Sequence, residues 1–323
     1  MRALLIHNPA AGRKLVRRGL PEALTLLRGH GWTVDVMQTQ GPAHASSLAA
    51  HAAPDGYEAV LVAGGDGTIN LVVQGLMAAQ EAGFAPVTLG LLPAGTSNVL
   101  ALDLGLPAPA LGVELSLPKA AKALLRSQVI SIDVGCAISQ TGRRFFLCWA
   151  GIGLDAAVAR IVEGQPHSKQ RFGRVYFLTT FVRMLNRPDL FTTYTITADD
   201  KTVRALSPLA VVSNIKRYAA IFPMAPQATL DDGLLDVTFW QVSDVPTGLK
   251  LIPQLLEGHH IQHPAIRYLR AQRVVIEAAS PQDIHLDAEP FGKTPVSIEV
   301  VPRALPMFIP QSASARRLLA PES

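Results

Sequence analysis

The sequence of 323 residues contains little cysteine and little charge. Its two cysteines, Cys136 and Cys148, cannot build a disulfide framework for a chain of this size. Neither has a second cysteine at the short spacing that a cysteine-based zinc site needs, so we expect both to be small buried apolar side chains. Charged residues make up 17% of the chain and hydrophobic residues 49%, and this balance excludes disorder for most of its length.

The chain also lacks a long apolar segment of the kind that targets or anchors a protein. The apolar run at residues 3–7 is too short for a signal peptide. The longest uncharged stretch, residues 82–102, contains Pro86, Pro93 and several glycines, so it cannot form one membrane-spanning helix. We therefore expect a cytoplasmic protein, either free or at the inner face of the membrane.

Charge of one sign is in small excess. The chain has 29 Lys and Arg residues against 25 Asp and Glu residues, which gives a formal net charge of +4. A nucleic-acid-binding protein would be expected to carry a dense basic face with exposed aromatic side chains, so we expect no nucleic-acid partner. The mild positive charge is compatible with an anionic ligand or with peripheral contact to an anionic membrane surface.

In the first third of the chain, short apolar runs alternate with helical patterns. The apolar runs predict strands at residues 3–7, 32–37, 58–63 and 87–92. The segments between them predict helices at residues 21–30, 43–53 and 68–82. This alternation is typical of an α/β fold with a parallel sheet covered by helices on both faces. Ligands of such sheets bind beyond the carboxyl ends of the strands.

From about residue 129 the pattern changes to many strands and few helices. Helical insertions are expected only at residues 154–187 and 246–258, and one further helix, at residues 108–126, precedes the change. The expected strands are residues 131–138, 144–151, 192–198, 206–214, 234–242, 273–279, 283–287 and 296–301. Such a pattern predicts an antiparallel β-sandwich. We therefore divide the chain into an α/β domain at residues 1–128 and a β-rich domain at residues 129–323.

The most informative segment follows the third expected strand. Residues 64–68 read Gly-Gly-Asp-Gly-Thr, and a helix is expected to begin at Thr68. Glycines let backbone N–H groups close on a ligand, and a helix N-terminus adds a positive dipole end, so the segment suits a phosphate. A carboxylate repels phosphate unless a cation or a proton lies between them, so Asp66 suggests Mg²⁺ or proton transfer. The alternative is a tight turn in which Asp66 or Thr68 caps the helix.

Two further loops favour the phosphate site. Residues 8–12 (Asn-Pro-Ala-Ala-Gly) follow the first strand, and residues 93–98 (Pro-Ala-Gly-Thr-Ser-Asn) follow the fourth. In a parallel sheet both can converge with residues 64–68 at one edge. The segment at residues 64–68 is not a Walker A loop, because no Gly-Lys-Ser/Thr follows its glycines. Three small polar loops at one edge favour a shared ligand over three unrelated turns.

These loops resemble the nucleotide-site loops of the diacylglycerol kinase catalytic-domain family, which includes sphingosine kinases and bacterial lipid kinases. Two later motifs match in order. Residues 231–236 (Asp-Asp-Gly-Leu-Leu-Asp) are similar to the family's Asp-Gly-x-Leu segment, and residues 285–290 (His-Leu-Asp-Ala-Glu-Pro) to its Asp-Gly-Glu-Pro segment. NAD kinases share the Gly-Gly-Asp-Gly-Thr motif, whereas the ordered set is specific to the lipid-kinase branch. The resemblance implies a Rossmann-like domain of the NAD-kinase and lipid-kinase type.

The resemblance also implies a set of nucleotide contacts and a metal site. The implied nucleotide-binding residues are Asn8, Pro9, Gly12, Thr39, Gly64, Gly65, Asp66, Gly67, Thr68, Asn70, Thr96 and Asn98. The implied Mg²⁺ site consists of Asp232 with the backbone carbonyls of Thr229 and Leu234. Each part has a plainer alternative, since Thr39 could be a strand-end hydroxyl and Asp232 part of an ordinary turn before a strand.

The resemblance implies Glu289 as the catalytic proton acceptor. Asp287 lies two residues before it, so both side chains share one face if the strand continues. Paired carboxylates near a triphosphate could share a proton or a metal, so Asp287 is a further candidate catalytic residue. The alternative for residues 287–290 is a polar hairpin turn. The sphingosine branch favours the loop aspartate instead, so Asp66 competes with Glu289 for this role. Ala288 stands where the family has glycine, a difference that matters if the position requires a positive φ.

We therefore expect an ATP- and Mg²⁺-dependent lipid kinase that transfers the γ-phosphoryl group of ATP to a lipid hydroxyl, with diacylglycerol as the default acceptor. The β-rich domain would hold the lipid. The alternatives are a kinase for a soluble acceptor such as NAD and a non-catalytic nucleotide-binding regulatory protein. Residues 169–185, basic at one end and apolar along a helical face, are either a membrane-surface element or an ordinary packing helix. The identity of the lipid and the oligomeric state, with a homodimer among the alternatives, are left open.

Overall fold

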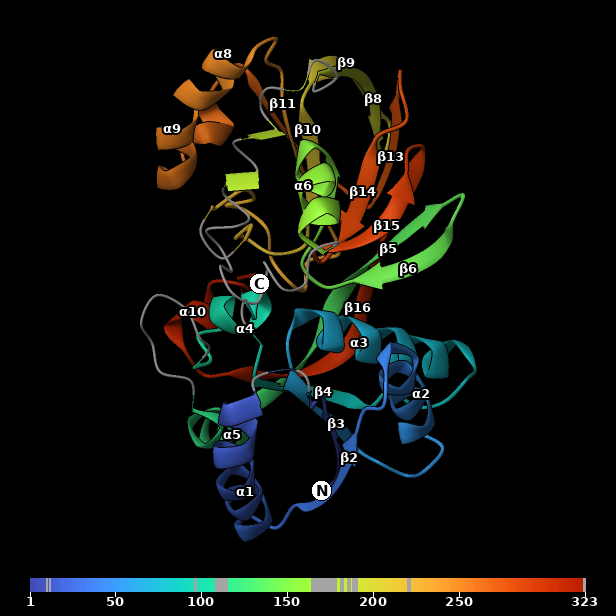
Figure 1. The fold of residues 1–323 in the computed structure, drawn as a ribbon, viewed down its shortest axis with the longest axis vertical. Helices are drawn as coiled ribbons and strands as arrows, with labels where there is room; N and C mark the ends of the chain where they lie inside the picture. The colour runs from blue at the N-terminus through green and yellow to red at the C-terminus, as the bar shows by residue number, and fades with distance from the viewer. Residues whose placement is uncertain are drawn as a thin grey trace. The chain divides into compact units, whose positions relative to one another are not determined.

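The computed structural model (Figure 1) describes residues 1–9, 11, 13–95, 98–107, 116–163, 179–180, 183–184, 187, 191–219 and 222–321. The chain forms two compact units. Unit 1 comprises Met1–Val134, Thr229–Asp232 and Pro302–Ser323, and unit 2 comprises Gly135–Ala228 and Gly233–Val301. The chain therefore first passes from unit 1 to unit 2 within strand β5 (Ser127–Ser139), close to the expected boundary after residue 128. The C-terminal segment differs from the expected division, because it returns to unit 1.

Unit 1 is built on a parallel sheet with the strand order β2-β1-β3-β4. Its strands are β1 (Arg2–His7), β2 (Thr33–Gln38), β3 (Ala59–Gly64) and β4 (Thr88–Pro93). All six residues of β3 are buried, because the strand pairs with β1 on one side and β4 on the other and helices cover both its faces. The last part of β16 (Val296–Pro310) lies parallel to β4, where Met307 pairs with Leu89. The predicted parallel sheet is confirmed.

Helices cover both faces of this sheet (Figure 1). Helices α1 (Arg13–Gly29) and α5 (Leu117–Leu125) pack together on one face, and α2 (Pro42–Ala52) and α3 (Asp66–Glu81) pack together on the other. The short helices α4 (Val99–Asp103) and α10 (Ala313–Arg316) complete the described helices of unit 1. The prediction that the first helix starts at Pro21 is wrong. Buried Val16 and Leu27 anchor the helix on both sides of the exposed proline, so the helix tolerates the lost hydrogen bond.

Unit 2 consists of two antiparallel sheets, as predicted for a β-sandwich. One sheet has the order β16-β13-β8-β9, with β5 beside β16 and β6 beside β5, and it contains β6 (Gly142–Phe146), β8 (Thr192–Ala198), β9 (Lys201–Ser207) and β13 (Arg273–Ala278). The other has the order β12-β11-β10-β7-β14-β15, with β7 (Trp149–Gly153), β10 (Leu209–Ser213), β11 (Leu235–Trp240), β12 (Ile266–Ala271), β14 (Asp283–Leu286) and β15 (Glu289–Lys293). Its described helices are α6 (Leu154–Glu163), α8 (Val245–Lys250), α9 (Ile252–Glu257) and the short 3₁₀ turn His260–Gln262.

The core of unit 2 lies between its two sheets. Alternate residues of each strand point inward, so that Tyr194 and Ile196 of β8 meet the same core as Val237 and Phe239 of β11. All four side chains are fully buried. Full burial of one large apolar side chain contributes about 1.5–3 kcal/mol, so this alternation supplies much of the driving force for folding of the sandwich.

Several strand boundaries correct the expectations from sequence. The single strand expected at residues 144–151 is two strands, β6 and β7, and the one expected at residues 206–214 is likewise divided between β9 and β10. Strands β12 and β15 are not among the expected strands. The interruption between β6 and β7 has a cause far along the chain, since the backbone N–H groups of Leu147 and Cys148 donate to the carboxylate of Asp287.

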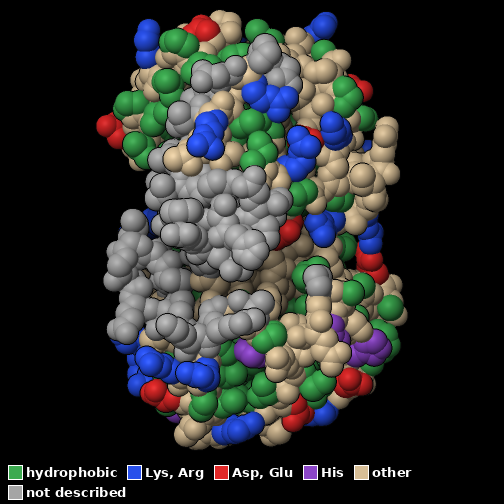
Figure 2. Space-filling model, viewed as in Figure 1, with side chains coloured by type: hydrophobic (Ala, Val, Ile, Leu, Met, Phe, Trp, Pro, Cys, Tyr) green, Lys and Arg blue, Asp and Glu red, His purple; other side chains and the backbone are tan. Residues whose placement is uncertain are grey.

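The described surface shows neither a membrane-spanning element nor a continuous field of one charge on the face in view. Among the described residues, none of the helices has the length and apolar character that crossing a bilayer requires. On the face shown in Figure 2, Lys and Arg side chains lie singly or in small groups among neutral and acidic ones. Most of residues 164–187, the remainder of the helical insertion expected at residues 154–187 with a break at residues 164–166, lie outside the described residues.

Candidate functional site

The glycine turn of unit 1 connects a buried strand directly to a helix. The chain leaves β3 at Gly64 and enters α3 at Asp66, slightly earlier than the predicted start at Thr68. Gly65 is the N-cap residue, and no side chain caps the helix. A Cβ atom on Gly64 would lie 2.7 Å from the Cβ atom of Thr68, so only glycine fits this close to the helix. The first N–H groups of a helix have no partners within the helix, and with the helix dipole they form a ready anion site.

The loop after β4 packs directly on this turn. Ala94 donates its backbone N–H to the carbonyl oxygen of Gly64 at 2.9 Å. A Cβ atom on Gly95 would lie only 2.4 Å from the Cα atom of Gly65. The two loops therefore touch backbone to backbone, which requires glycine at the contact.

Asn98 shapes the second of these loops from within. Its φ is +46°, and its side chain is fully buried. The Oδ1 atom accepts the N–H of Gly95 at 3.2 Å, and Nδ2 donates to the carbonyl oxygen of Gly95 at 2.7 Å. These two hydrogen bonds of Asn98 hold the loop in place, and its nucleotide contact stays a prediction.

The loop after β1 joins the other two. Asn8 donates its backbone N–H to Ala63 at 3.1 Å, and its Nδ2 atom donates to the hydroxyl of Thr68 at 3.0 Å. Thr39, at the end of β2, donates its backbone N–H to the carbonyl of His7 at 2.9 Å. The predicted convergence of the three loops is confirmed by these contacts. The predicted ligand residues Gly12 and Thr96 lie outside the described residues.

Two buried or half-buried polar side chains stabilise the start of α3. Asp66 Oδ1 accepts the N–H of Val99 at 2.9 Å, so this carboxylate connects the N-termini of α3 and α4. Both helix dipoles favour a negative charge at that point. Asn70 is buried, and its Oδ1 atom accepts a hydrogen bond from Gln74 at 3.2 Å. Asp66 therefore has a framework role in addition to any chemical role.

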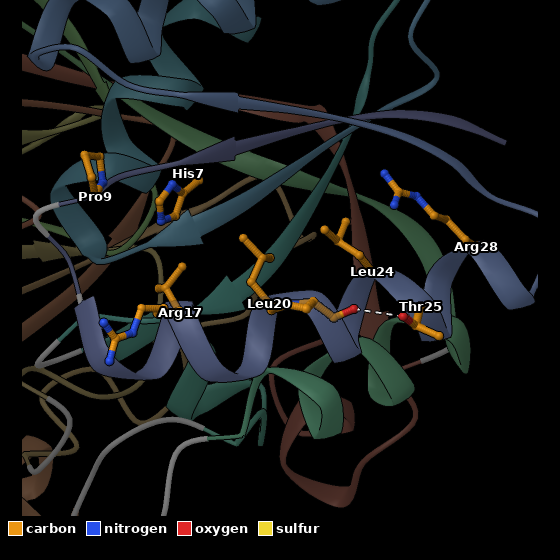
Figure 3. Close-up of a pocket in the computed structure, with 9 residues that line it drawn as sticks. His7, Pro9, Arg17, Leu20, Leu24, Thr25 and Arg28 are labelled. Atoms are coloured by element: carbon orange, nitrogen blue, oxygen red, sulfur yellow. Dashed lines mark hydrogen bonds between the residues drawn. The ribbon is translucent and has the colours of Figure 1, made fainter.

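A pocket of about 830 Å³ opens beside the first loop (Figure 3). It is lined by His7, Pro9, Val16, Arg17, Leu20, Pro21, Leu24, Thr25 and Arg28. Leu20 and Leu24 point from α1 toward the strands, and Arg17 and Arg28 stand farther along the helix in either direction (Figure 3). Burial lowers the pKa of His7, which favours a neutral imidazole. The volume is within the range of small-molecule sites.

The loop expected to hold Mg²⁺ is held firmly in unit 1. The hydroxyl of Thr229 donates to Oδ2 of Asp232, and Asp231 accepts the N–H of Ala320 at 2.6 Å. Leu234 follows in unit 2, directly before β11. Within the described part of the chain, no three His, Cys, Asp or Glu residues lie close enough to share a metal. A metal here would therefore bind one carboxylate and backbone carbonyls, which are oxygen ligands of the kind that Mg²⁺ prefers.

In unit 2, the predicted carboxylate of Asp287 lies within a tight turn, and that of Glu289 follows the turn directly. Strand β14 ends at Leu286 and β15 begins at the half-buried Glu289. The condition under which Asp287 and Glu289 would share a strand face, a strand that continues through both residues, is not met, because the chain reverses between β14 and β15. The φ angles of Asp287 and Ala288 are +50° and +72°, so the positive φ suspected at Ala288 is present.

Asp287 anchors this turn. Its carboxylate accepts backbone N–H groups from Leu147 at 2.9 Å, Cys148 at 2.8 Å and Trp149 at 3.2 Å. Only 7% of the residue is exposed. These contacts hold the hairpin against the start of β7, and the catalytic role predicted for Asp287 stays a prediction.

A buried polar cluster behind the turn was not singled out in the sequence. His285 Nε2 lies 3.2 Å from Oδ2 of Asp155, and the hydroxyl of Tyr218 donates to the same oxygen at 3.2 Å. Because 130 positions separate Asp155 from His285, no local pattern connects them. Only the folded sandwich brings them together.

Comparison with known proteins identifies the family. A model of the diacylglycerol kinase catalytic domain matches residues 2–137, and a model described as the YegS C-terminal NAD kinase beta sandwich-like domain matches residues 149–309. The chain belongs to the diacylglycerol kinase catalytic-domain family. The two matched segments correspond to the α/β and sandwich parts of the fold.

Relatives of similar length support this membership. The chain is 28% identical over 299 residues to the diacylglycerol kinase of Bacillus subtilis strain 168, covering 91% of each chain. It is 24% identical over 321 residues to that of Staphylococcus saprophyticus, covering 98% of each. A crystal structure of a diacylglycerol kinase from Bacillus anthracis Sterne has the same fold, with a TM-score of 0.69 at 20% identity, over 96% of this chain and 97% of that one. The family supports a kinase.

Proposed function

We propose that the protein is an ATP- and Mg²⁺-dependent lipid kinase that transfers the γ-phosphoryl group of ATP to a lipid hydroxyl, with diacylglycerol as the acceptor. The observation that carries this proposal is the uncapped N-terminus of α3 at the Gly64-Gly65 turn, joined to two further loops by backbone and side-chain contacts. Backbone N–H groups at such a turn suit the phosphates of a nucleotide. The names of the relatives point to diacylglycerol.

Phosphoryl transfer requires mainly positioning and neutralisation of charge, which this chain can supply with few side chains. The glycine turn would hold phosphate oxygens through its backbone. A bound Mg²⁺ would supply positive charge, and the donor set at Asp232, with the carbonyls of Thr229 and Leu234, fits its preference for oxygen ligands. That loop is the structural metal site implied by the motif.

Glu289 is the favoured general base of this proposal. It begins β15, is half-buried, and follows a turn that is held by its neighbours. In this role its carboxylate would take the proton from the acceptor hydroxyl as the phosphoryl group is transferred. Asp66 is the second candidate, although its Oδ1 atom already accepts the N–H of Val99.

The test is transfer of labelled phosphate from ATP to diacylglycerol in mixed micelles, with the product identified by mass. We expect Glu289→Gln to lower kcat by about 100-fold or more, in keeping with loss of a general base. The matched control is Glu277→Gln on β13, an exposed glutamate of the same unit. Normal turnover in both Glu289→Gln and Asp66→Asn would defeat the proposed mechanism.

A soluble acceptor is the second candidate function, because the second matched domain is described as similar to the NAD kinase sandwich. The same assay with NAD in place of lipid distinguishes the two. A protein that binds ATP but phosphorylates neither NAD nor any member of a lipid panel would instead be a non-catalytic nucleotide-binding protein. Peripheral membrane contact and a homodimer remain proposals that vesicle flotation and sedimentation would test.

A further inference from the structure

The turn that precedes Glu289 adopts a backbone conformation that its sequence does not favour. Its two central residues, Asp287 and Ala288, both have positive φ angles, a geometry for which hairpins normally use Asn-Gly or Asp-Gly. Alanine is a poor residue at φ +72°, because its Cβ atom crowds the backbone. The turn therefore needs contacts from outside itself.

His285 supplies one of these contacts. Its Nδ1 atom accepts the backbone N–H of Ala288 at 3.1 Å, across the turn. An Nδ1 atom that accepts a hydrogen bond carries no proton, so in the neutral ring the proton is on Nε2. That proton points to Oδ2 of Asp155, 3.2 Å away. The imidazole thus connects the strained turn to a carboxylate at the start of α6.

Asp155 is in turn held by its own neighbours. Its Oδ1 atom accepts the N–H of Ala156 at 2.9 Å, and Oδ2 accepts the hydroxyl of Tyr218 at 3.2 Å. Burial, followed by the negative charge of Asp155, raises the pKa of Tyr218 well above its ordinary value, so the hydroxyl keeps its proton. The ring of Tyr218 also packs on Trp149, with centroids 4.9 Å apart. Asp155 and His285 are almost completely buried, at 3% and 1% exposure.

Gly151 of β7 has no side chain, and the side chains of Asp155 and His285 occupy the space where a Cβ atom would lie. It pairs with His285 across β7 and β14. A Cβ atom at Gly151 would lie 2.0 Å from Oδ2 of Asp155 and 2.2 Å from Nε2 of His285. Contact between the two side chains is possible only because a glycine stands opposite.

We propose that His285, oriented by Asp155 and Tyr218, is a positioning residue that holds the Asp287–Ala288 turn and thereby the carboxylate of Glu289. The inference rests on the proposed function, in which Glu289 takes the proton of the acceptor. Asp287 restrains one side of the turn through the backbone of residues 147–149, and His285 restrains the other through Ala288. A base held in this way would reach the acceptor hydroxyl in one geometry.

Two substitutions at His285 separate its two contacts. In His285→Asn, the amide oxygen stands near the position of Nδ1 and can still accept the N–H of Ala288. In His285→Gln, the amide nitrogen stands near Nε2 and can still donate to Asp155, but the bond to Ala288 is lost. We expect His285→Gln to lower kcat at least 10-fold while KM for ATP and for diacylglycerol stays within about 2-fold, and His285→Asn to lose less.

The control for His285→Gln is His263→Gln. His263 Nδ1 also accepts a backbone N–H, from Ala265 at 3.1 Å, so the control breaks the same kind of bond away from Glu289. Equal kcat in the two variants would overturn the proposal. A raised KM for the lipid with unchanged kcat would overturn it as well, since that result indicates contact with substrate and not positioning.

Rescue distinguishes positioning from a general loss of structure. Ala288→Gly removes the conformational conflict in the turn. In the His285→Gln background it should restore kcat about 3-fold or more, relative to its effect in the wild-type background. Absence of this rescue, with both proteins folded by circular dichroism, would contradict the proposal.

Two single substitutions of tyrosine by phenylalanine test the proposal if the histidine variants fail to fold. Tyr218→Phe removes the hydroxyl that donates to Asp155, whereas Tyr194→Phe removes a buried hydroxyl with no hydrogen-bond partner in the described part of the chain. We expect kcat to fall about 3-fold or more in Tyr218→Phe and to stay unchanged in Tyr194→Phe. Equal values would overturn the proposal.

Amide hydrogen exchange separates failure of this inference from failure of the proposed function. In His285→Gln, or in Tyr218→Phe should that variant alone fold, the amides of residues 287–289 should exchange at least 10-fold faster than in the matched control. If the wild-type protein phosphorylates no acceptor, the proposed function fails, and the exchange rates still decide whether the cluster restrains the turn. Unchanged exchange rates would overturn the restraint itself.

Discussion

The Gly64-Gly65 turn of unit 1 with the two loops that contact it, here called the cradle, and the Asp287–Ala288 turn of unit 2 are held in place in opposite ways. In the cradle, small residues let backbones touch, as at Gly65 and Gly95, and short polar contacts such as that between Asn8 and Thr68 complete it. In the turn, an unfavourable backbone is held by the buried side chains of Asp287 and His285, which bind the backbone of residues 147–149 and the carboxylate of Asp155. The comparison teaches that a site can be fixed either by glycines and backbone groups or by a network of charged and aromatic side chains.

The largest expected effect comes from Gly151→Ala, which places a methyl group between the side chains of Asp155 and His285. The new Cβ atom would overlap Asp155 and His285, so both must move in a buried site. Overpacking of this kind costs about 1–3 kcal/mol, and separating a buried carboxylate from its partners adds to that. We expect a loss of about 3 kcal/mol in the free energy of unfolding, measured by urea denaturation, together with a fall in kcat.

The control for this experiment is Gly248→Ala in α8. A Cβ atom at Gly248 would lie no closer than 3.8 Å to the atoms around it, and alanine favours helix over glycine. We therefore expect no loss of stability in this variant. If the Gly151→Ala protein is as stable as the Gly248→Ala protein, the cluster of Asp155, Tyr218 and His285 can move to accommodate a Cβ atom, and the prediction is wrong.

Gly95→Ala attacks the cradle and should have an intermediate effect. Its Cβ atom would come 2.4 Å from the Cα atom of Gly65, so one backbone must shift where the phosphate groups are proposed to bind. We expect ATP affinity, measured by calorimetry, to fall about 10-fold or more, equivalent to about 1.4 kcal/mol. Gly29→Ala at the end of α1 has open space around it and is the control. If the affinity for ATP is unaltered in Gly95→Ala, the glycine turn does not take part in nucleotide binding.

The smallest expected effect is an increase in stability on Ala288→Gly. Relief of the left-handed alanine is worth about 1–2 kcal/mol, whereas the extra freedom of glycine in the unfolded chain costs about 0.4–1 kcal/mol. The net gain in unfolding free energy should therefore lie between about 0 and about 1.6 kcal/mol. A loss of stability would mean that the methyl group of Ala288 contributes packing that outweighs its strained φ.

The parallel sheet and the cradle could be predicted from sequence because their signals are local. The apolar run of β3 precedes Gly64-Gly65 immediately, and the match to the other loops depends only on their order. The predictions were weaker for the sandwich, where β12 and β15 were missed and one expected strand is divided at Leu147 and Cys148. That division depends on the carboxylate of Asp287, 140 positions from Leu147.

The sequence by itself determined the α/β and sandwich pattern, and it predicted a phosphate site at the glycine turn and an acid–base role for Glu289, both of which are proposals here. These follow from the side-chain and backbone properties of neighbouring residues. Only the tertiary structure decided that Asp287 anchors a reversed chain and that Asp155, Tyr218 and His285 form one buried cluster. Such contacts depend on strand pairing and on the space left by Gly151. Neither can be predicted from residues that lie so far apart in the sequence.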